Sequence, residues 1–115
     1  MTAAERLIDL QIEAYNARDL ERFVATYSTE IEVFRPPATA PVLSGMHQLE
    51  EFYSTQRFCH PGLHAEILGR IAIGNLVADH ERVLGLPGGP VVLLATYEVT
   101  RGLIRRVWLF SPTDA

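Results

Sequence analysis

The chain has 115 residues, of which 48% are apolar and 21% charged, and its formal net charge is −4 at neutral pH. This composition is typical of a folded globular protein, and the length suits one domain with one core, expected over residues 1–115. The negative charge argues against a nucleic acid partner, because binding to phosphates depends on clustered basic side chains.

The sequence shows no sign of a membrane or exported protein. No apolar stretch approaches the roughly 18 residues of a membrane span, and the first residues lack a basic region followed by an apolar run. Cys59 is the only cysteine, so no internal disulfide can form, which suits a reducing compartment. We therefore expect a cytoplasmic protein without a membrane partner.

The first 27 residues predict two consecutive helices. Thr2 can cap a helix of about four turns, whose apolar positions recur at helical spacing as far as Tyr15. Asp19 offers the next N-cap, and the apolar spacing then predicts a shorter helix that runs through Tyr27.

A strand and a third helix follow. Residues 30–35 alternate in the manner of a short strand, and Pro36 and Pro37 end it because proline cannot donate a hydrogen bond to a neighbouring strand. Residues 36–45 are expected to form a loop, and helical spacing predicts a helix over 46–58.

The second half of the chain predicts only strands. Short turns of hairpin type separate these strands, so they should form a consecutive antiparallel meander. Helices grouped before strands indicate the α+β class rather than alternating α/β. The expected strands cover residues 63–73, 76–86, 91–101 and 103–110.

The order of these elements, together with four short motifs, resembles the nuclear-transport-factor-2-like superfamily and its SnoaL-like branch. The resemblance implies a cone-shaped α+β fold, in which three helices pack on a curved, mainly antiparallel sheet that encloses a pocket. It also implies a homodimer formed through the outer face of the sheet. The motifs are Asn16-Ala17-Arg18-Asp19-Leu20, Ser44-Gly45, Glu51-Phe52-Tyr53 and His80-Glu81-Arg82-Val83.

This branch includes ketosteroid isomerases, whose catalytic groups are largely replaced here. By alignment, the two oxyanion-stabilising positions hold Gln11 and Thr96, and the position of the proton-carrying aspartate holds Arg35. Only a supporting tyrosine of the third helix is kept, as Tyr53. Without the base carboxylate, isomerisation by that route has no proton carrier.

The branch also includes limonene epoxide hydrolases, which use an arginine between two aspartates. Arg82 matches the arginine, but Leu84 and Trp108 stand at the aspartate positions. A lone arginine cannot shuttle a proton because its pKa is far above neutrality. The resemblance therefore predicts the fold but not the reaction.

The superfamily register predicts which side chains face the pocket. With period-two alternation, His80, Arg82 and Leu84 are expected to point inward, and Asp79 and Glu81 outward. By the same alternation, Thr96 and Glu98 on the next strand, and Arg106, Trp108 and Phe110 on the last, are also expected to point inward. The expected ligand-binding residues are Gln11, Tyr15, Arg35, Tyr53, Leu84, Thr96, Arg106, Trp108 and Phe110.

Three residues are the candidate catalytic group. His80 suits acid-base work because imidazole titrates near neutral pH, Arg82 could hold a carboxylate or oxyanion, and Glu98 could orient or deprotonate. Each has a structural alternative: a hydrogen-bonded strand histidine, or a cross-strand ion pair of Glu98 with Arg106 or Arg82. The tyrosines, Trp108 and Phe110 could likewise serve only in packing.

No cofactor or metal is expected. The segment Cys59-His60-Pro61-Gly62-Leu63-His64 matches no zinc spacing, and no glycine pattern precedes a helix as phosphate binding requires. Three functions stay open: a cofactor-free enzyme of isomerase, hydrolase or cyclase type acting on a small apolar carbonyl or epoxide-like compound, a non-catalytic binding protein for a small apolar ligand, or a homodimeric interaction module.

Overall fold

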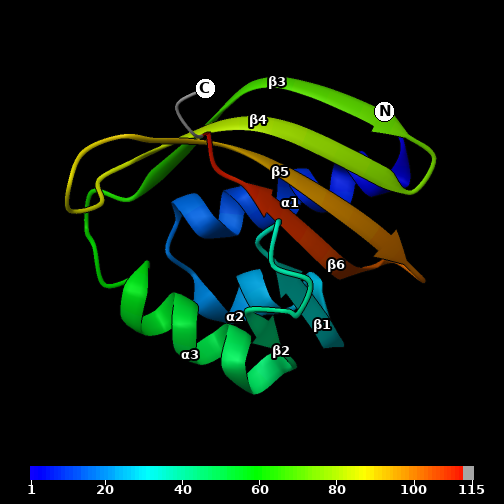
Figure 1. The fold of residues 1–115 in the computed structure, drawn as a ribbon, viewed down its shortest axis with the longest axis horizontal. Helices are drawn as coiled ribbons and strands as arrows, with labels where there is room; N and C mark the ends of the chain where they lie inside the picture. The colour runs from blue at the N-terminus through cyan, green and yellow to red at the C-terminus, as the bar shows by residue number, and fades with distance from the viewer. Residues whose placement is uncertain (113–115) are drawn as a thin grey trace.

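The structure is a computed structural model that describes residues 1–112, so the last three residues of the expected domain lie outside it. Three helices within this range lie on one side of a six-stranded sheet, which curves over them (Figure 1). This arrangement confirms the predicted α+β fold. The elements are α1 (Ala3–Asn16), α2 (Leu20–Val24), β1 (Tyr27–Phe34), β2 (Leu43–Ser44), α3 (Met46–Gln56), β3 (His64–Ile73), β4 (Leu76–Leu84), β5 (Val91–Thr100) and β6 (Leu103–Phe110).

The sheet has the strand order β2-β1-β6-β5-β4-β3. Strands β3 to β6 form the predicted antiparallel meander, and β2 is antiparallel to β1. Strand β1 lies parallel to β6, which places the first strand of the chain beside the last. None of the helices in residues 1–112 is long and apolar enough to cross a membrane.

Two details of the first half differ from the sequence prediction. The second helix ends at Val24, and Tyr27 opens β1 instead of continuing the helix. The reason is tertiary, because the Ile104 amide donates to the carbonyl of Thr26 at 2.9 Å and draws this segment to β6. The expected loop also contains the short strand β2, which pairs with β1.

Side-chain hydrogen bonds define both ends of α1. The Glu5 amide donates to Thr2 Oγ1 at 3.1 Å and the Thr2 amide donates to Glu5 Oε1 at 3.0 Å, so both form a capping box at the start of the helix. At its other end, the Asn16 side chain donates to the Ala65 carbonyl at 3.1 Å and accepts from the Ala65 amide at 2.7 Å. These two bonds fix the end of α1 to β3.

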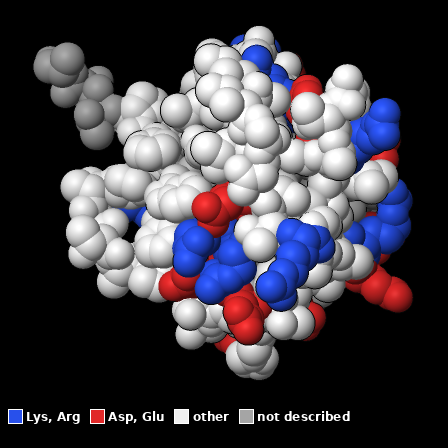
Figure 2. Space-filling model, turned by 90° about the vertical axis from the view of Figure 1, so that its right-hand side faces the viewer, with Lys and Arg blue, Asp and Glu red and all other residues white. Residues whose placement is uncertain are grey.

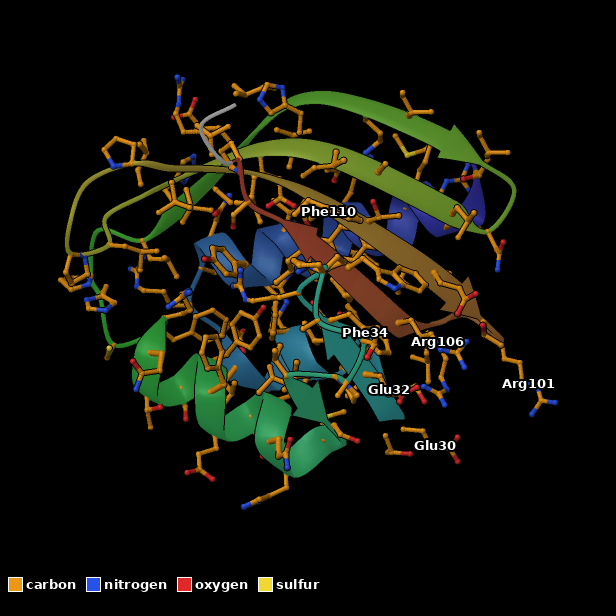
Figure 3. The ribbon with its side chains drawn as sticks, viewed as in Figure 1. Glu30, Glu32, Phe34, Arg101, Arg106 and Phe110 are labelled. Atoms are coloured by element: carbon orange, nitrogen blue, oxygen red, sulfur yellow. The ribbon has the colours of Figure 1, made fainter. Side chains whose placement is uncertain are left out.

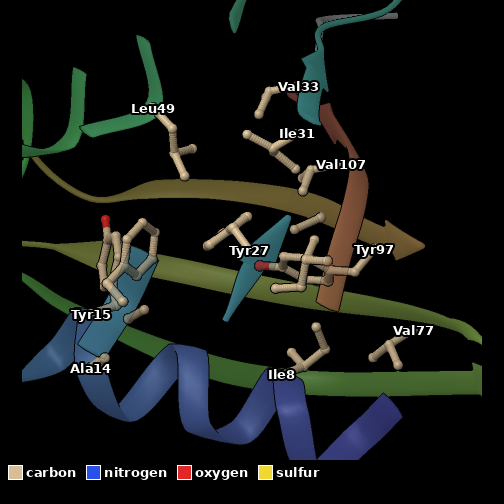
Figure 4. Close-up of a cluster of buried hydrophobic side chains, with 14 of the residues drawn as sticks. Ile8, Ala14, Tyr15, Tyr27, Ile31, Val33, Leu49, Val77, Tyr97 and Val107 are labelled. Atoms are coloured by element: carbon tan, nitrogen blue, oxygen red, sulfur yellow. The ribbon is translucent and has the colours of Figure 1, made fainter. Parts of the chain in front are cut away.

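The core lies between the helices and the concave face of the sheet (Figure 4). Phe23 of α2 is fully buried, and its ring centroid lies 4.7 Å from that of Tyr53, 5.0 Å from Tyr27 and 5.2 Å from Phe58. Edge-to-face and tilted contacts of this kind stabilise beyond the area they bury. This cluster joins α2, α3 and β1 into one packed unit.

The predicted facing of β4 and β5 is wrong. Asp79 and Glu81 are buried on the inner face together with Val77 and Val83, whereas His80 is exposed on the outer face. A shift of one residue in register turns every side chain of a strand to the opposite face. For the same reason, the residues of β5 and β6 that were expected to face inward lie on the outer face of the sheet.

The loop between β4 and β5 is held close to the segment that precedes β3. Gly85 has a φ of +87°, and a Cβ at this position would overlap the carbonyl oxygen of Gly62. Only glycine fits this close approach of two backbones. Gly88, in the same loop, has a φ of +93°, but a Cβ at this position would meet no atom within 4 Å.

We expect Gly85→Ala to destabilise the protein by about 3 kcal/mol or more, because backbone strain and overlap with Gly62 act together. Gly88→Ala should cost only about 1–2 kcal/mol, since it carries the backbone strain alone. Urea unfolding of both variants checks this. Equal losses of stability would contradict the role assigned to the Gly62 contact.

Candidate functional site

A cavity of about 90 Å³ lies between the helices and the inner face of the sheet. Its polar lining contains Glu81 of β4, Tyr97 of β5, three residues of α1 and α3, and also Arg35, Arg57 and Ser111, whereas the other lining residues are apolar. The helix residues are Gln11, Tyr15 and Tyr53. A second, more apolar hollow of about 120 Å³ lies beside the first and shares Phe52 and Tyr53 with it.

Glu81 is the central ionisable group of the cavity. Its side chain is only 7% exposed, and the Tyr97 hydroxyl donates to Glu81 Oε2 at 3.0 Å. Burial raises the pKa of Glu81 from 4.5 to about 7, against the opposing effect of the Tyr97 hydrogen bond. Near neutral pH this carboxyl can therefore both accept and release a proton.

Asp79, two residues earlier on the same face, has a different environment. It is fully buried, and Arg70 of β3 donates to both of its oxygens at 2.6 and 3.0 Å. Arg70 also donates to Asp9 of α1 at 2.8 Å. Because its charge is neutralised by a bidentate partner, Asp79 links the strands, which leaves Glu81 as the inward carboxyl of β4 without a cationic partner in the described residues.

Gln11 presents an acceptor to the cavity. Its Nε2 donates to the Tyr27 hydroxyl at 3.0 Å, whereas its Oε1 is the one buried side-chain polar atom in residues 1–112 without a hydrogen-bond partner. An unsatisfied buried acceptor costs free energy unless a donor reaches it. A hydroxyl or enol group of a ligand would supply that donor.

Tyr15 and Tyr53 add two hydroxyl groups to the cavity wall, with ring centroids 6.3 Å apart. Burial raises the pKa of both phenols, so they stay protonated near neutral pH and can donate hydrogen bonds. The nearby Arg57 guanidinium opposes part of this rise in pKa. Donors placed in this way can stabilise negative charge on a carbonyl oxygen.

The structure brings together four of the expected ligand-binding residues. Gln11, Tyr15, Arg35 and Tyr53 all line the cavity. The sequence analysis missed Glu81 because the assumed register turned it outward. A pattern in the sequence could have identified Glu81 as an inward residue. It has the same parity along β4 as Val77 and Val83, and both valines are buried.

The three expected catalytic residues are not in the cavity wall. His80 is exposed on the outer face, and Arg82 pairs there with Glu66 at 3.0 Å. Glu98 accepts from Arg106 Nη1 at 2.8 Å, as the cross-strand alternative proposed. Arg106 also contacts Glu32 of β1 at 3.4 Å, and Figure 3 shows these two side chains at the same rim.

The remaining expected ligand-binding residues also belong to the outer face. Leu84 has the same parity as His80 on β4, and Thr96 pairs with Ala78, which also shares that parity. Trp108 pairs with Thr96, and its ring stacks on Phe34 with centroids 5.9 Å apart. Phe110 borders a shallow hollow with His80 on that face. Basic and acidic groups alternate on the neighbouring side of the molecule (Figure 2).

Within residues 1–112, no group of three histidine, cysteine, aspartate or glutamate side chains is arranged to hold a metal ion. The side chains of the cavity offer chemistry of their own. A carboxyl that titrates near pH 7, two phenol donors and an amide acceptor can move a proton and stabilise an oxyanion.

Residues 8–107 match the model of the SnoaL-like domain family. A proposed ketosteroid isomerase from Kribbella flavida has a TM-score of 0.82 at 21% identity, covering 98% of this chain and 80% of that one. A computationally designed 17-OHP binder has a TM-score of 0.86 at 15% identity, covering 99% and 95%. TerC, co-crystallised with polyporic acid, has a TM-score of 0.80 at 13% identity, covering 96% and 92%. No curated protein sequence matches the chain significantly.

We expect Glu81→Gln to stabilise the protein at pH 8 but hardly at pH 4.5. Because the pKa of Glu81 is raised from 4.5 to about 7, the unfolded chain loses this proton first as the pH rises. Stability therefore falls between those values, by up to about 3 kcal/mol above pH 7. Glutamine carries no charge and removes this loss.

Urea unfolding at several pH values measures the effect, with the exposed Glu50→Gln as the matched control. A difference between wild type and Glu81→Gln that does not change with pH would refute the raised pKa.

Proposed function

The chain belongs to the SnoaL-like domain family, and we propose that it is a cofactor-independent enzyme that moves a proton on a small apolar carbonyl or epoxide-like compound. The observation that carries this proposal is the carboxyl of Glu81, which is buried in the cavity wall, forms no ion pair within residues 1–112 and has a pKa of about 7. Such a group is matched to acid-base catalysis at neutral pH.

The cavity residues support a two-step proton transfer. Glu81 takes the proton from a carbon next to the carbonyl group, and the electron pair of that C–H bond shifts so that negative charge develops on the carbonyl oxygen. The hydroxyls of Tyr15 and Tyr53 donate to this oxygen. Glu81 then returns the proton to a different atom, which completes an isomerisation.

Tyr97 and Gln11 support this reaction without exchanging a proton. The hydrogen bond from Tyr97 holds one oxygen of the Glu81 carboxylate and leaves the other for the substrate. Gln11 Oε1 accepts from a hydroxyl or enol group and so fixes the orientation of the bound molecule.

A non-catalytic binding protein for a small apolar ligand is the second candidate. The unpartnered Gln11 Oε1 and the adjoining apolar hollow favour it, because both select a ligand without any reaction. Tight binding of a compound whose protons Glu81 never exchanges would favour this function over the enzyme.

We also propose a homodimer formed through the outer face of the sheet. Large apolar side chains are exposed there on neighbouring strands, and patches of this kind mark association surfaces in soluble proteins. A second copy fits best because a two-fold axis sets the same apolar patch against itself. The exposed residues are Leu68, Ile71, Ile73, Leu76, Val92, Leu94 and Phe110.

A small neutral probe of carbon deprotonation tests the enzyme. We expect the protein to accelerate ring opening of 5-nitrobenzisoxazole, with a rate that rises with pH through about 7 as Glu81 ionises. Glu81→Gln should lower this rate by about 100-fold or more. Glu98→Gln, which removes an acid from the outer face, is the matched control and should react like wild type. Full activity of Glu81→Gln would show that another group is the base.

Leu94→Glu tests the dimer. Leu94 lies between His80 and Phe110 across the outer face and is 41% exposed. A charge buried there should convert a dimer into a monomer, as measured by light scattering during gel filtration. The control is Leu10→Glu, on the exposed side of α1. A monomeric wild type at micromolar concentration would disprove the dimer.

A further inference from the structure

Two guanidinium groups line the cavity without a carboxylate partner. Arg35 follows β1 and Arg57 follows α3, and within residues 1–112 neither forms an ion pair. The arginines elsewhere that lie near acidic side chains do pair with them: Arg22, Arg70, Arg82, Arg105 and Arg106. Arg6, Arg18 and Arg101 also form no ion pair within residues 1–112, but they are exposed and lie outside the cavity wall, whereas Arg35 and Arg57 line it.

Local contacts hold Arg57 in place. Its guanidinium carbon lies 4.9 Å from the centroid of the Phe52 ring, and its Nη1 donates to the Gln56 carbonyl at 3.0 Å. These contacts use the face of the guanidinium and one of its donors, so further N–H groups are free to bind a ligand. Both Phe52 and Arg57 belong to the cavity wall.

Arg35 approaches the same region from the sheet. It lines the main cavity and also the apolar hollow, where Val33 and Leu43 are its neighbours. Burial raises the pKa of the Tyr53 phenol, and the positive charges of Arg57 and Arg35 each oppose part of that rise. Both arginines therefore belong to the same cavity wall as Tyr15 and Tyr53, the proposed oxyanion donors.

The acid within the cavity does not neutralise these arginines. Glu81 is buried on β4, and the positive charge that acts on it is that of Arg70 rather than Arg35 or Arg57. Arginine stays charged at every pH at which the protein is folded, and its planar fork matches a carboxylate. A ligand that carries a carboxylate would therefore complete the charge balance.

We propose that the substrate is a small apolar carboxylic acid whose carboxylate binds between Arg35 and Arg57, with its apolar part in the cavity and the adjoining hollow. This inference rests on the proposed function in one respect, because the acid is a substrate only if Glu81 transfers a proton on it. The carboxylate anchors the molecule and takes no part in the proton transfer. Recognition of the anion and catalysis are thus assigned to different residues.

Phenylpyruvate and its methyl ester form a matched pair of probes, since both carry an acidic C–H group beside a carbonyl but only the first is an anion. Isothermal titration calorimetry of the intact protein at pH 7.5 measures both affinities. We expect the acid to bind about tenfold or more tightly than the ester. Arg57→Leu and Arg35→Leu should each remove most of this preference and leave binding of the ester unchanged.

Two further variants separate this inference from the proposed function. Arg101→Leu removes an exposed arginine of the β5–β6 turn and should preserve the preference for the acid. Glu81→Gln should also preserve it, because the anchor lies elsewhere, while exchange of the C3 protons of phenylpyruvate with deuterated solvent should fall to the rate measured without protein. Thermal unfolding checks that each variant is folded. If one of the two arginine variants fails to fold, the other still tests the carboxylate site.

Equal binding of acid and ester, no binding of either, or a preference that survives both arginine substitutions would overturn the carboxylate site. Those results would leave the proposed enzyme standing if the neutral probe 5-nitrobenzisoxazole is still turned over through Glu81. Conversely, selective binding of the acid without proton exchange would support the anion site and refute the enzyme.

Discussion

Two carboxylates point inward from β4, and a cation balances only one of them within residues 1–112. Arg70 donates to both oxygens of Asp79 and also reaches Asp9, so one guanidinium links α1, β3 and β4. Glu81 accepts instead from the neutral hydroxyl of Tyr97. Since a buried charge without a partner is unfavourable, this difference keeps Asp79 as a structural group and shifts the pKa of Glu81 toward neutral pH.

The polar groups of the cavity come from both the sheet and the helices. Glu81 and Tyr97 belong to the sheet, Gln11 and Tyr15 to α1, and Arg57 follows α3. Several elements therefore position these groups, and the aromatic cluster around Phe23 packs Tyr15 of α1 and Tyr53 of α3 against α2. The cost of burying Glu81 is the kind of local destabilisation that proteins retain where a reactive group is needed.

The strands that build the cavity also carry a second, unrelated surface. Alternation along β4 and β5 sends Glu81 and Tyr97 to the inner face, and it sends His80, Leu94 and Glu98 to the outer face. The outer face combines exposed apolar side chains with ion pairs that cross from β5 to β6 and β1. The proposed association and the proposed reaction can therefore be tested separately by substitutions in the same strands.

The sequence by itself determined the order and type of the three helices and the five longer strands, though not of β2, because the caps at Thr2 and Asp19 and the turns between strands act over a few residues. It also identified Gln11, Tyr15, Arg35 and Tyr53 as cavity residues through the family resemblance. Only the tertiary structure decided which face of β4 and β5 is buried. Both parities of β5 carry apolar residues, so alternation alone could not distinguish them, and the choice rests on distant partners such as Arg70 for Asp79 and Tyr97 for Glu81.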